Sequence, residues 1–132
     1  MRLSTTYARN GLADELGAQF DGGEIRVYSG TRPAGPDTAL SGNTLLVTMT
    51  FADPAFFPAS GGIAAAHTIT GGTGVADGTA TFARLVDSSS NAVADVSVGV
   101  GTGELQLSTL TVSIGLLVEP TASFAITQPA GT

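Results

Sequence analysis

Two segments with alternating side chains, separated by a proline-containing loop, constrain the fold of this chain more than any other feature. Within residues 24–29, Ile25 and Val27 share one face, and Glu24, Arg26 and Tyr28 share the other. Residues 45–51 alternate in the same way, and a period of two is typical of a half-buried β-strand. The sequence therefore predicts two strands whose core residues are Ile25, Val27, Leu45, Val47, Met49 and Phe51.

One amphipathic helix is predicted before these strands, over residues 5–17, with Ser4 as its N-cap. Its apolar stripe has i, i+4 spacing and consists of Ala8, Leu12, Leu16 and Phe20. Gly11 weakens such a helix by about 1 kcal/mol relative to alanine. We therefore expect Leu12 and Leu16 to dock onto the sheet or onto a neighbouring subunit.

Short strands separated by glycines and small polar residues follow the first two. We expect them near residues 64–70, 79–86, 94–100, 104–107, 110–116 and 121–127. Residues 87–91 have the composition of a hairpin turn, and glycines 99, 101 and 103 mark another reversal. The predicted fold is mainly β, an antiparallel β-sandwich or barrel-like domain over residues 21–132, with one N-terminal α-helix and its lead-in over residues 1–20.

The composition narrows the classes of function. A formal net charge of −6, with no lysine, opposes binding to a phosphate backbone, so we expect no direct nucleic-acid contact. The absence of cysteine excludes a thiolate zinc site, a cysteine nucleophile and disulfides, and a domain of this length needs no cofactor to fold. No apolar run approaches about 18 residues, so no membrane span is predicted. The low charged fraction of 12% suggests that subunits or a partner cover part of the exterior.

Candidate catalytic and metal-binding groups are sparse. His67, the only histidine, lies in a predicted strand without a nucleophile motif beside it. Asp37 and Asp53 are the obvious candidates for a glycosidase pair, but each adjoins a proline, and this position favours turn initiation over paired catalysis. Residues 71–78 are glycine-rich but lack the lysine of a phosphate-binding loop, and they favour a flexible connection. We expect no catalytic, cofactor or metal site, and an Asx-turn rather than a calcium loop at residues 87–91.

For several other residues, a binding role competes with a structural one. Arg26 and Arg84 lie in predicted strands, where cross-strand pairing with acids competes with a binding role. Tyr28 beside Arg26 would make a small sugar platform, although two tyrosines and no tryptophan leave little aromatic surface for carbohydrate. Between two prolines, either Phe56 or Phe57 is expected to plug the end of the core or a subunit contact.

The segments at residues 23–34, 45–51 and 78–87, behind an N-terminal amphipathic helix, resemble small virion proteins encoded among the head and tail genes of tailed double-stranded DNA bacteriophages. The resemblance covers nearly the whole chain. It departs from the family pattern at residues 116–120, Leu-Leu-Val-Glu-Pro, where small turn residues are expected before the last strand.

The resemblance implies a non-enzymatic particle component, at the head-to-tail neck or collar or decorating the capsid, made in the host bacterial cytoplasm and located in the virion. Its partners would be copies of itself in a homo-oligomer and other virion proteins of the capsid, portal or neck. The helix and the long loop at residues 31–43 are the expected contact elements. Candidate contact residues are Ala8, Leu12, Leu16, Arg32, Pro33, Pro36, Asp37, Phe56 and Phe57.

Two other classes of function remain open. A carbohydrate- or receptor-binding β-module of the tail would use Arg26, Tyr28 and His67. A hydrolase would use Asp37 and Asp53.

Overall fold

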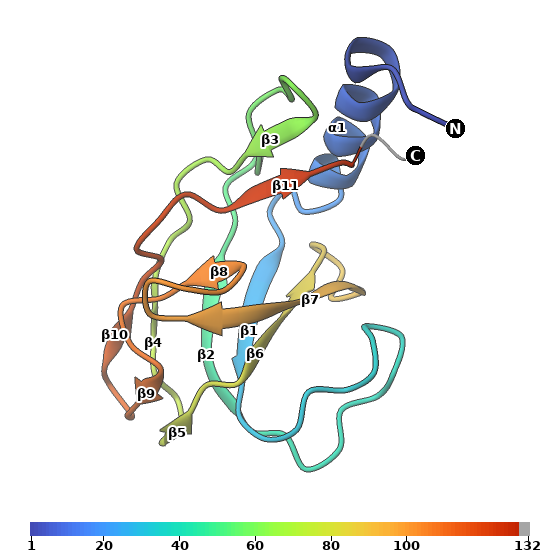
Figure 1. Cartoon of the computed structure of the whole chain (residues 1–132). Coiled ribbons are helices and arrows are strands. Elements are labelled where there is room, and N and C mark those ends of the chain that lie inside the picture. Colours follow the sequence, from blue (N-terminus) through green and yellow to red (C-terminus); the bar gives the residue numbers. More distant parts are fainter. Residues whose placement is uncertain (130–132) are drawn as a thin grey trace.

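The computed structural model describes residues 1–129 and is a mainly-β fold with one N-terminal helical segment (Figure 1). The helical segment joins a π-helical turn, η1 (Thr5–Arg9), to α1 (Asn10–Ala18). The strands are β1 (Glu24–Tyr28), β2 (Leu45–Thr50), β3 (Ile63–Ala65), β4 (Gly72–Thr73), β5 (Gly78–Thr79), β6 (Phe82–Val86), β7 (Ala92–Gly99), β8 (Leu105–Gln106), β9 (Thr111–Val112), β10 (Leu117–Val118) and β11 (Ala125–Thr127). The predicted fold class is confirmed, although most strands after β2 are shorter than expected.

The main sheet is curled and has the strand order β2-β1-β6-β7-β8. Its first four strands pair antiparallel, but β8 runs parallel to β7, with Val98 opposite Leu105. The short connection from β7 to the parallel strand β8 passes through Gly101 and Gly103, whose positive φ angles of 73° and 86° favour glycine. A purely antiparallel arrangement was therefore the wrong expectation at this edge. Three two-stranded ribbons, β3–β11, β4–β10 and β5–β9, complete the β structure.

A β-bulge changes which residues of β2 reach the core. Val27 lies opposite Val47 and Tyr28 opposite Leu45, so Leu46 is an extra residue on β2. A bulge locally breaks the alternation of faces. Leu46 and Val47 are both fully buried, whereas Leu45 is only half-buried. The prediction of Leu45 as a core residue is therefore wrong, and the other five predicted core residues of β1 and β2 are confirmed.

The helix begins as predicted but faces the core with a different stripe. The Ser4 side chain accepts a hydrogen bond from the Tyr7 backbone N–H at 3.2 Å. The buried residues of α1 are Ala13 and Gly17, and Leu12 is 47% exposed. Small residues face inward because the helix approaches closely. A Cβ on Gly17 would lie 3.3 Å from the ring of Phe56. The buried side thus consists of Ala13, Leu16, Gly17 and Phe20, rather than Ala8, Leu12, Leu16 and Phe20.

Polar side chains also hold the helical segment to the chain after β2. Asn10 accepts a hydrogen bond from the Gly62 N–H at 2.8 Å, and Asp14 accepts one from the Ala59 N–H at 2.7 Å. Just beyond the helix, Asp21 accepts the Ala55 N–H at 2.8 Å. These three acceptors satisfy backbone donors that no strand reaches, so the helix and the 55–62 segment position each other.

A buried ion pair lies on the sheet face opposite the main core. Arg84 of β6 and Asp95 of β7 are cross-strand neighbours, joined by hydrogen bonds of 2.8 Å and 3.1 Å. Their side chains are 8% and 2% exposed. The hydrogen bond to Asp95 raises the pKa of Arg84, against the opposing effect of burial. Cross-strand pairing is therefore confirmed for Arg84, whereas Arg26 pairs with Glu24 on its own strand.

The predicted turn at residues 87–91 is an Asx-turn that joins β6 to β7. The Asp87 carboxylate accepts the backbone N–H groups of Ser89 and Asn91 at 2.9 Å and 2.8 Å. These hydrogen bonds, led by the one from Asn91, lower the pKa of Asp87. Ser90 adopts a φ of 68°, which completes the reversal.

Close backbone packing replaces the flexible loop that was predicted at residues 71–78. Gly72 and Thr73 form β4, which pairs with β10, and Val75 donates its N–H to Leu46 of β2 at 2.7 Å. A Cβ on Gly72 would overlap the Thr48 carbonyl oxygen. Glycine is present here because two backbones approach closely, so this segment is ordered structure rather than a mobile connection.

We predict that Arg84→Met lowers the free energy of unfolding by about 3–5 kcal/mol, because it leaves the Asp95 carboxylate buried without its partner. Urea denaturation of the full chain measures this loss. The control is Arg26→Met, which breaks a half-exposed pair and should cost less than about 1 kcal/mol. Adding Asp95→Leu to Arg84→Met should restore part of the stability. Equal losses for the two single variants would contradict the assignment.

We predict that Gly72→Ala destabilises the fold by about 1–3 kcal/mol, because the new methyl group forces β4 away from β2. The matched control is Gly11→Ala, where a Cβ meets nothing within 4 Å and alanine favours the helix. That control should be stabilising by up to about 1 kcal/mol. Thermal unfolding followed by circular dichroism measures both, and a neutral Gly72→Ala would refute the close approach.

Candidate functional site

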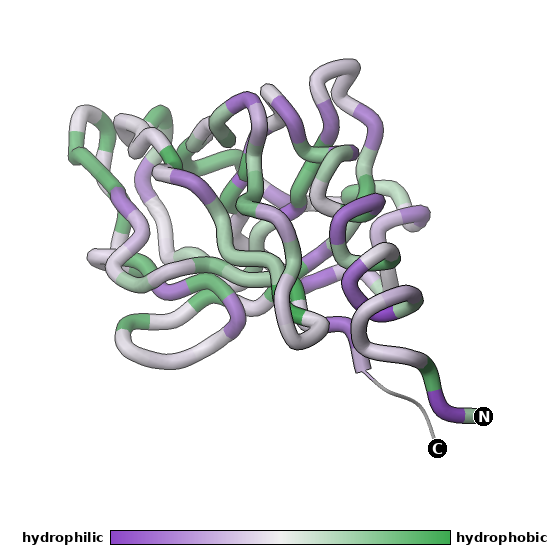
Figure 2. The backbone as a smooth tube through the Cα atoms, turned by 90° about the horizontal axis from the view of Figure 1, so that it is seen from above, coloured by the Kyte–Doolittle hydropathy of each residue, from purple (hydrophilic) through white to green (hydrophobic). Residues whose placement is uncertain are grey.

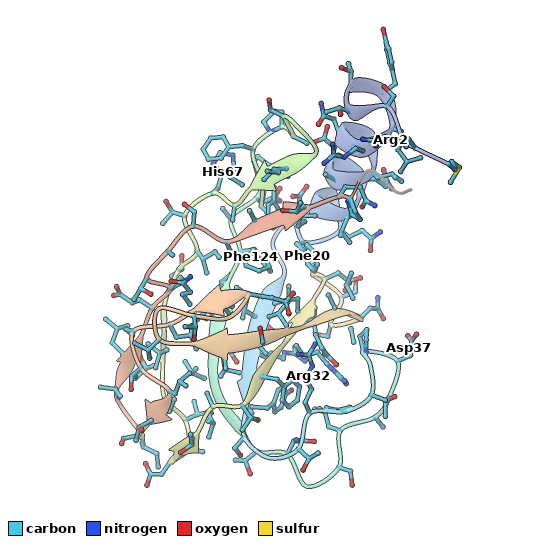
Figure 3. The ribbon with its side chains drawn as sticks, in the orientation of Figure 1. Arg2, Phe20, Arg32, Asp37, His67 and Phe124 are labelled. Atoms are coloured by element: carbon cyan, nitrogen blue, oxygen red, sulfur yellow. The ribbon has the colours of Figure 1, made fainter. Side chains whose placement is uncertain are left out.

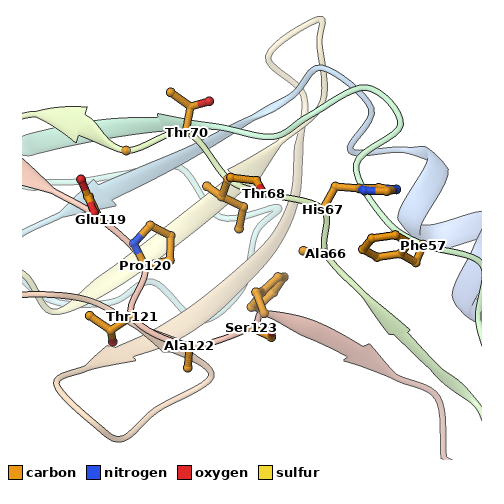
Figure 4. A pocket seen from close by; sticks show the side chains of 13 residues that line it. Phe57, Ala66, His67, Thr68, Thr70, Glu119, Pro120, Thr121, Ala122 and Ser123 are labelled. Carbon is orange, nitrogen blue, oxygen red and sulfur yellow. The ribbon is translucent and has the colours of Figure 1, made fainter.

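An open groove lies between residues 66–71 and residues 119–124 (Figure 4). It has a volume of about 730 Å³, and Phe57 closes the side near the helix. Most of its lining side chains are small, as in Ala66, Thr68, Thr121, Ala122 and Ser123. We call it the split groove, because its two walls are the strands of one ribbon that separate in the middle.

Each wall of the split groove is anchored on its outer side. On the first wall, Thr70 exchanges backbone hydrogen bonds of 2.9 Å and 3.1 Å with Thr50, and the His67 N–H donates to the Ala55 carbonyl at 2.8 Å. The second wall is anchored in the same way: Thr121 donates to the Gln106 carbonyl at 2.9 Å, and the Glu119 carbonyl accepts the Ser108 N–H at 2.9 Å. The two walls are therefore pulled towards different neighbours, and the space between them is the groove.

The polar side chains of the split groove lie at opposite ends. The His67 ring contacts the Phe57 ring at a centroid distance of 3.6 Å with a tilt of 34°. At the other end, Glu119 lies over Gly71, where a Cβ would come within 2.8 Å of the glutamate Cγ. No ion pair to Glu119 is present among the described residues, so its carboxylate gives this end a negative charge.

The candidate catalytic residues are not brought together. Asp37 is exposed in the loop between β1 and β2, and Asp53 precedes a cis proline after β2. Neither lines the split groove or the two smaller hollows. His67 lines the groove, but no aspartate does, and the only carboxylate there is Glu119. Within residues 1–129, no group of three histidine or acidic residues is arranged to hold a metal ion.

The suggested sugar platform on β1 is not available. Tyr28 is only 8% exposed, and its ring stacks on Phe82 at a centroid distance of 5.6 Å. The Arg26 guanidinium is held by the Glu24 carboxylate at 2.8 Å and by the Ser90 hydroxyl at 3.0 Å. The expectation that Tyr28 presents an exposed ring is therefore wrong, because the ring packs against Phe82 of β6.

The long loop after β1 is tied to the sheet. Arg32 donates to the Asp95 carbonyl at 3.0 Å, and Arg84 donates to the Gly35 carbonyl at 3.2 Å. Asn43 closes the base of the loop through the Ser29 and Thr31 carbonyls, each at 2.9 Å. Arg32 lies against the sheet, and Asp37 lies on the outer side of the loop (Figure 3).

The nine candidate contact residues fall into three environments. Phe56 is buried in the core, which confirms that one phenylalanine of its pair plugs the core. Four are half-buried: Ala8, Leu16, Pro33 and Pro36. Four are exposed: Leu12, Arg32, Asp37 and Phe57.

An exposed apolar cluster lies at the end of the molecule opposite the helix, where Figure 2 also shows hydrophobic segments of the backbone tube. We call it the apolar tip, and its side chains are between 41% and 70% exposed: Val75, Ile114, Leu116 and Leu117. Backbone hydrogen bonds hold its two segments together, from Gly74 to the Leu116 carbonyl at 2.8 Å and from Gly115 to the Gly74 carbonyl at 2.9 Å.

Sequence reasoning missed both the apolar tip and the split groove. The signal for the tip is the set of apolar side chains at Ile114, Leu116 and Leu117, but the predictions place them in a strand near residues 110–116 and in the segment at residues 116–120 that departs from the family pattern. For the groove, no residue type signals an open strand edge, since alanine, threonine and serine are common in any strand.

The described chain has no helix long and apolar enough to cross a membrane. No protein-family model, curated protein or solved structure matches the sequence or the fold.

Proposed function

We propose that this protein is a non-enzymatic structural component of a tailed bacteriophage particle, which assembles at the head-to-tail neck or collar or on the capsid surface through protein–protein contacts. The apolar tip is the observation that carries the assembly role. Four large aliphatic side chains remain exposed at one end of a chain whose core is otherwise well filled. Contiguous exposed apolar surface is characteristic of a protein–protein contact.

The particle is suggested by the resemblance of the helix, β1, β2 and β6 segments to small virion proteins. The physical features agree with such a role. Only 12% of the residues are charged, and the buried ion pair takes Arg84 and Asp95 off the surface. The exterior is therefore weakly charged and suited to packing against copies of itself or other virion proteins.

The apolar tip and the helix are alternative contact surfaces, because they lie at opposite ends of the molecule (Figure 1). Leu12 is the exposed apolar residue of α1 and was a candidate contact from the sequence. Burying the tip in an interface would stabilise the assembly by roughly 1.5–3 kcal/mol for each aliphatic side chain that is fully covered. The tip gathers four such residues on two segments that are hydrogen-bonded to each other, whereas the helical end exposes Tyr7 and Leu12 on one helical segment.

We predict that Ile114→Asp/Leu117→Asp weakens self-association by at least about a hundredfold, because two apolar side chains lose burial in the contact. Analytical ultracentrifugation over a range of concentrations measures this, with circular dichroism to confirm that the variant is folded. The comparison variant is Leu12→Asp, which adds charge at the helix end and should leave association unchanged. Association that is lost in Leu12→Asp and kept in the double variant would transfer the contact to the helix.

The placement in a particle is tested separately. Mass spectrometry of purified phage that encodes this chain should find the protein in the particle fraction, and electron microscopy should place it at the neck, collar or capsid surface. Its absence from purified particles would end the virion proposal and leave the apolar tip as a contact in some other assembly.

A further inference from the structure

We propose that the split groove binds an extended, positively charged segment of another polypeptide, which inserts between the two walls as an additional β-strand. This inference is separate from the assembly role, because it concerns a different surface and rests on backbone geometry rather than on the apolar tip. It names the partner by its chemistry, namely a strand with free backbone amides, small or β-branched side chains and a basic residue near one end.

The walls belong to one ribbon whose register is the same at both ends of the groove. Ala65 lies opposite Ala125 at one end, and Gly72 lies opposite Val118 at the other. An equal number of residues separates the two pairs on each strand, so neither wall contains an insertion. The ribbon is therefore a single antiparallel ladder that has opened in its middle, and its opening is the length of a short strand.

The opening leaves strand edges without partners. Within residues 1–129, Thr68 and Ile69 on one wall and Ala122 and Ser123 on the other make no hydrogen bond. The outer edges of both walls are already occupied, by the Thr50 segment on one side and the Gln106 segment on the other. Neighbouring residues of an extended strand direct their backbone groups to opposite sides. Thr68 and Ala122, which follow the outward-bonded His67 and Thr121, therefore direct theirs into the groove, and unpaired strand edges are templates for an added strand.

The size of the groove suits one strand. A five-residue wall spans about 16 Å at the usual rise of a β-strand. The volume of about 730 Å³ is lined mainly by alanine, serine, threonine and glycine, so little side-chain bulk occupies the path. Because the walls run antiparallel to each other, the inserted strand would be parallel to one wall and antiparallel to the other, and both pairings occur in this fold.

The two ends of the groove differ in chemistry, and this difference defines the direction in which a partner strand would lie. The Glu119 carboxylate has no cationic partner in the described chain, and it lies at the Gly71 end. Phe57 and Phe124 line the opposite end. A segment with a lysine or arginine at one end and an apolar residue at the other complements both ends, and its positive charge also favours encounter with a chain of net charge −6.

Hydrogen exchange of the free chain tests the open ladder without any ligand. The amides of Thr68, Ile69, Ala122 and Ser123 should exchange rapidly, whereas those of Thr70 and Thr121 should be protected by their partners. Protection of the first group equal to that of the second would mean that the ribbon is closed in solution. That result would overturn the proposal.

Selection of random peptides of about eight to ten residues, long enough to cross the groove, tests strand insertion directly. Enriched peptides should contain a basic residue, lack central prolines and protect the groove amides on binding. In a strand held from both sides, alternate amides face alternate walls. Methylating any single central amide should therefore weaken binding by about tenfold or more. Failure to enrich any peptide, or tolerance of methylation at every amide, would overturn the proposal.

Protein variants complete the test. Glu119→Gln should weaken binding of the enriched basic peptides by about two- to fivefold, since the ion pair between Glu119 and the peptide is solvent-exposed. Asp37→Asn removes the same charge outside the groove and should leave the affinity unchanged.

The second pair of variants tests the backbone of the second wall. Ala122→Pro removes an amide from this wall and should abolish binding, whereas Thr121→Ala keeps every wall amide and should leave binding intact. If Ala122→Pro bound as tightly as the parent chain, the contact would not use this wall. Peptide methylation decides the question if that variant fails to fold.

Discussion

A cluster of four phenylalanines packs the helical segment, the main sheet and the β3–β11 ribbon against one another. Phe20 follows the helix, Phe51 follows β2, Phe56 lies in the next segment, and Phe124 precedes β11. Their rings contact one another at centroid distances of 5.2–6.4 Å, tilted by 30–55° (Figure 3 labels Phe20 and Phe124). Burial of each ring contributes roughly 1.5–3 kcal/mol, so the cluster offsets the entropy of bringing the two ends of the sequence to the sheet.

The split groove and the apolar tip both follow from how the ribbon beyond this cluster is attached. At one end, Phe124 and Phe56 hold the ribbon near the helix. At the other, Gly72 lets β4 lie directly on β2. Between these attachments the two strands follow different neighbours and open. Beyond Gly72 the backbone still contacts β2 through the Val75 N–H and the Leu46 carbonyl, but the aliphatic side chains of Val75 and residues 114–117 stay exposed and form the tip.

Local sequence signals succeeded where one segment sets its own conformation. The alternation in β1, the Ser4 cap and the turn at Asp87 were predicted, and each depends on residues that are near in sequence. The errors came from long-range packing. Leu46 is buried by a bulge set by β1, and Leu12 is exposed because the helix approaches through Gly17. No pattern within β2 or α1 contains that information.

The sequence by itself determined that this chain is mainly β with one N-terminal helix, because side-chain periodicity, glycine and proline act over a few residues. It also determined the weakly charged surface. Only the tertiary structure decided which strand edges stay unpaired and which apolar residues stay exposed. A backbone amide is chemically the same in every residue but proline, so its partner is chosen by the packing of distant segments. At Thr68 and Ala122 that packing leaves the choice open.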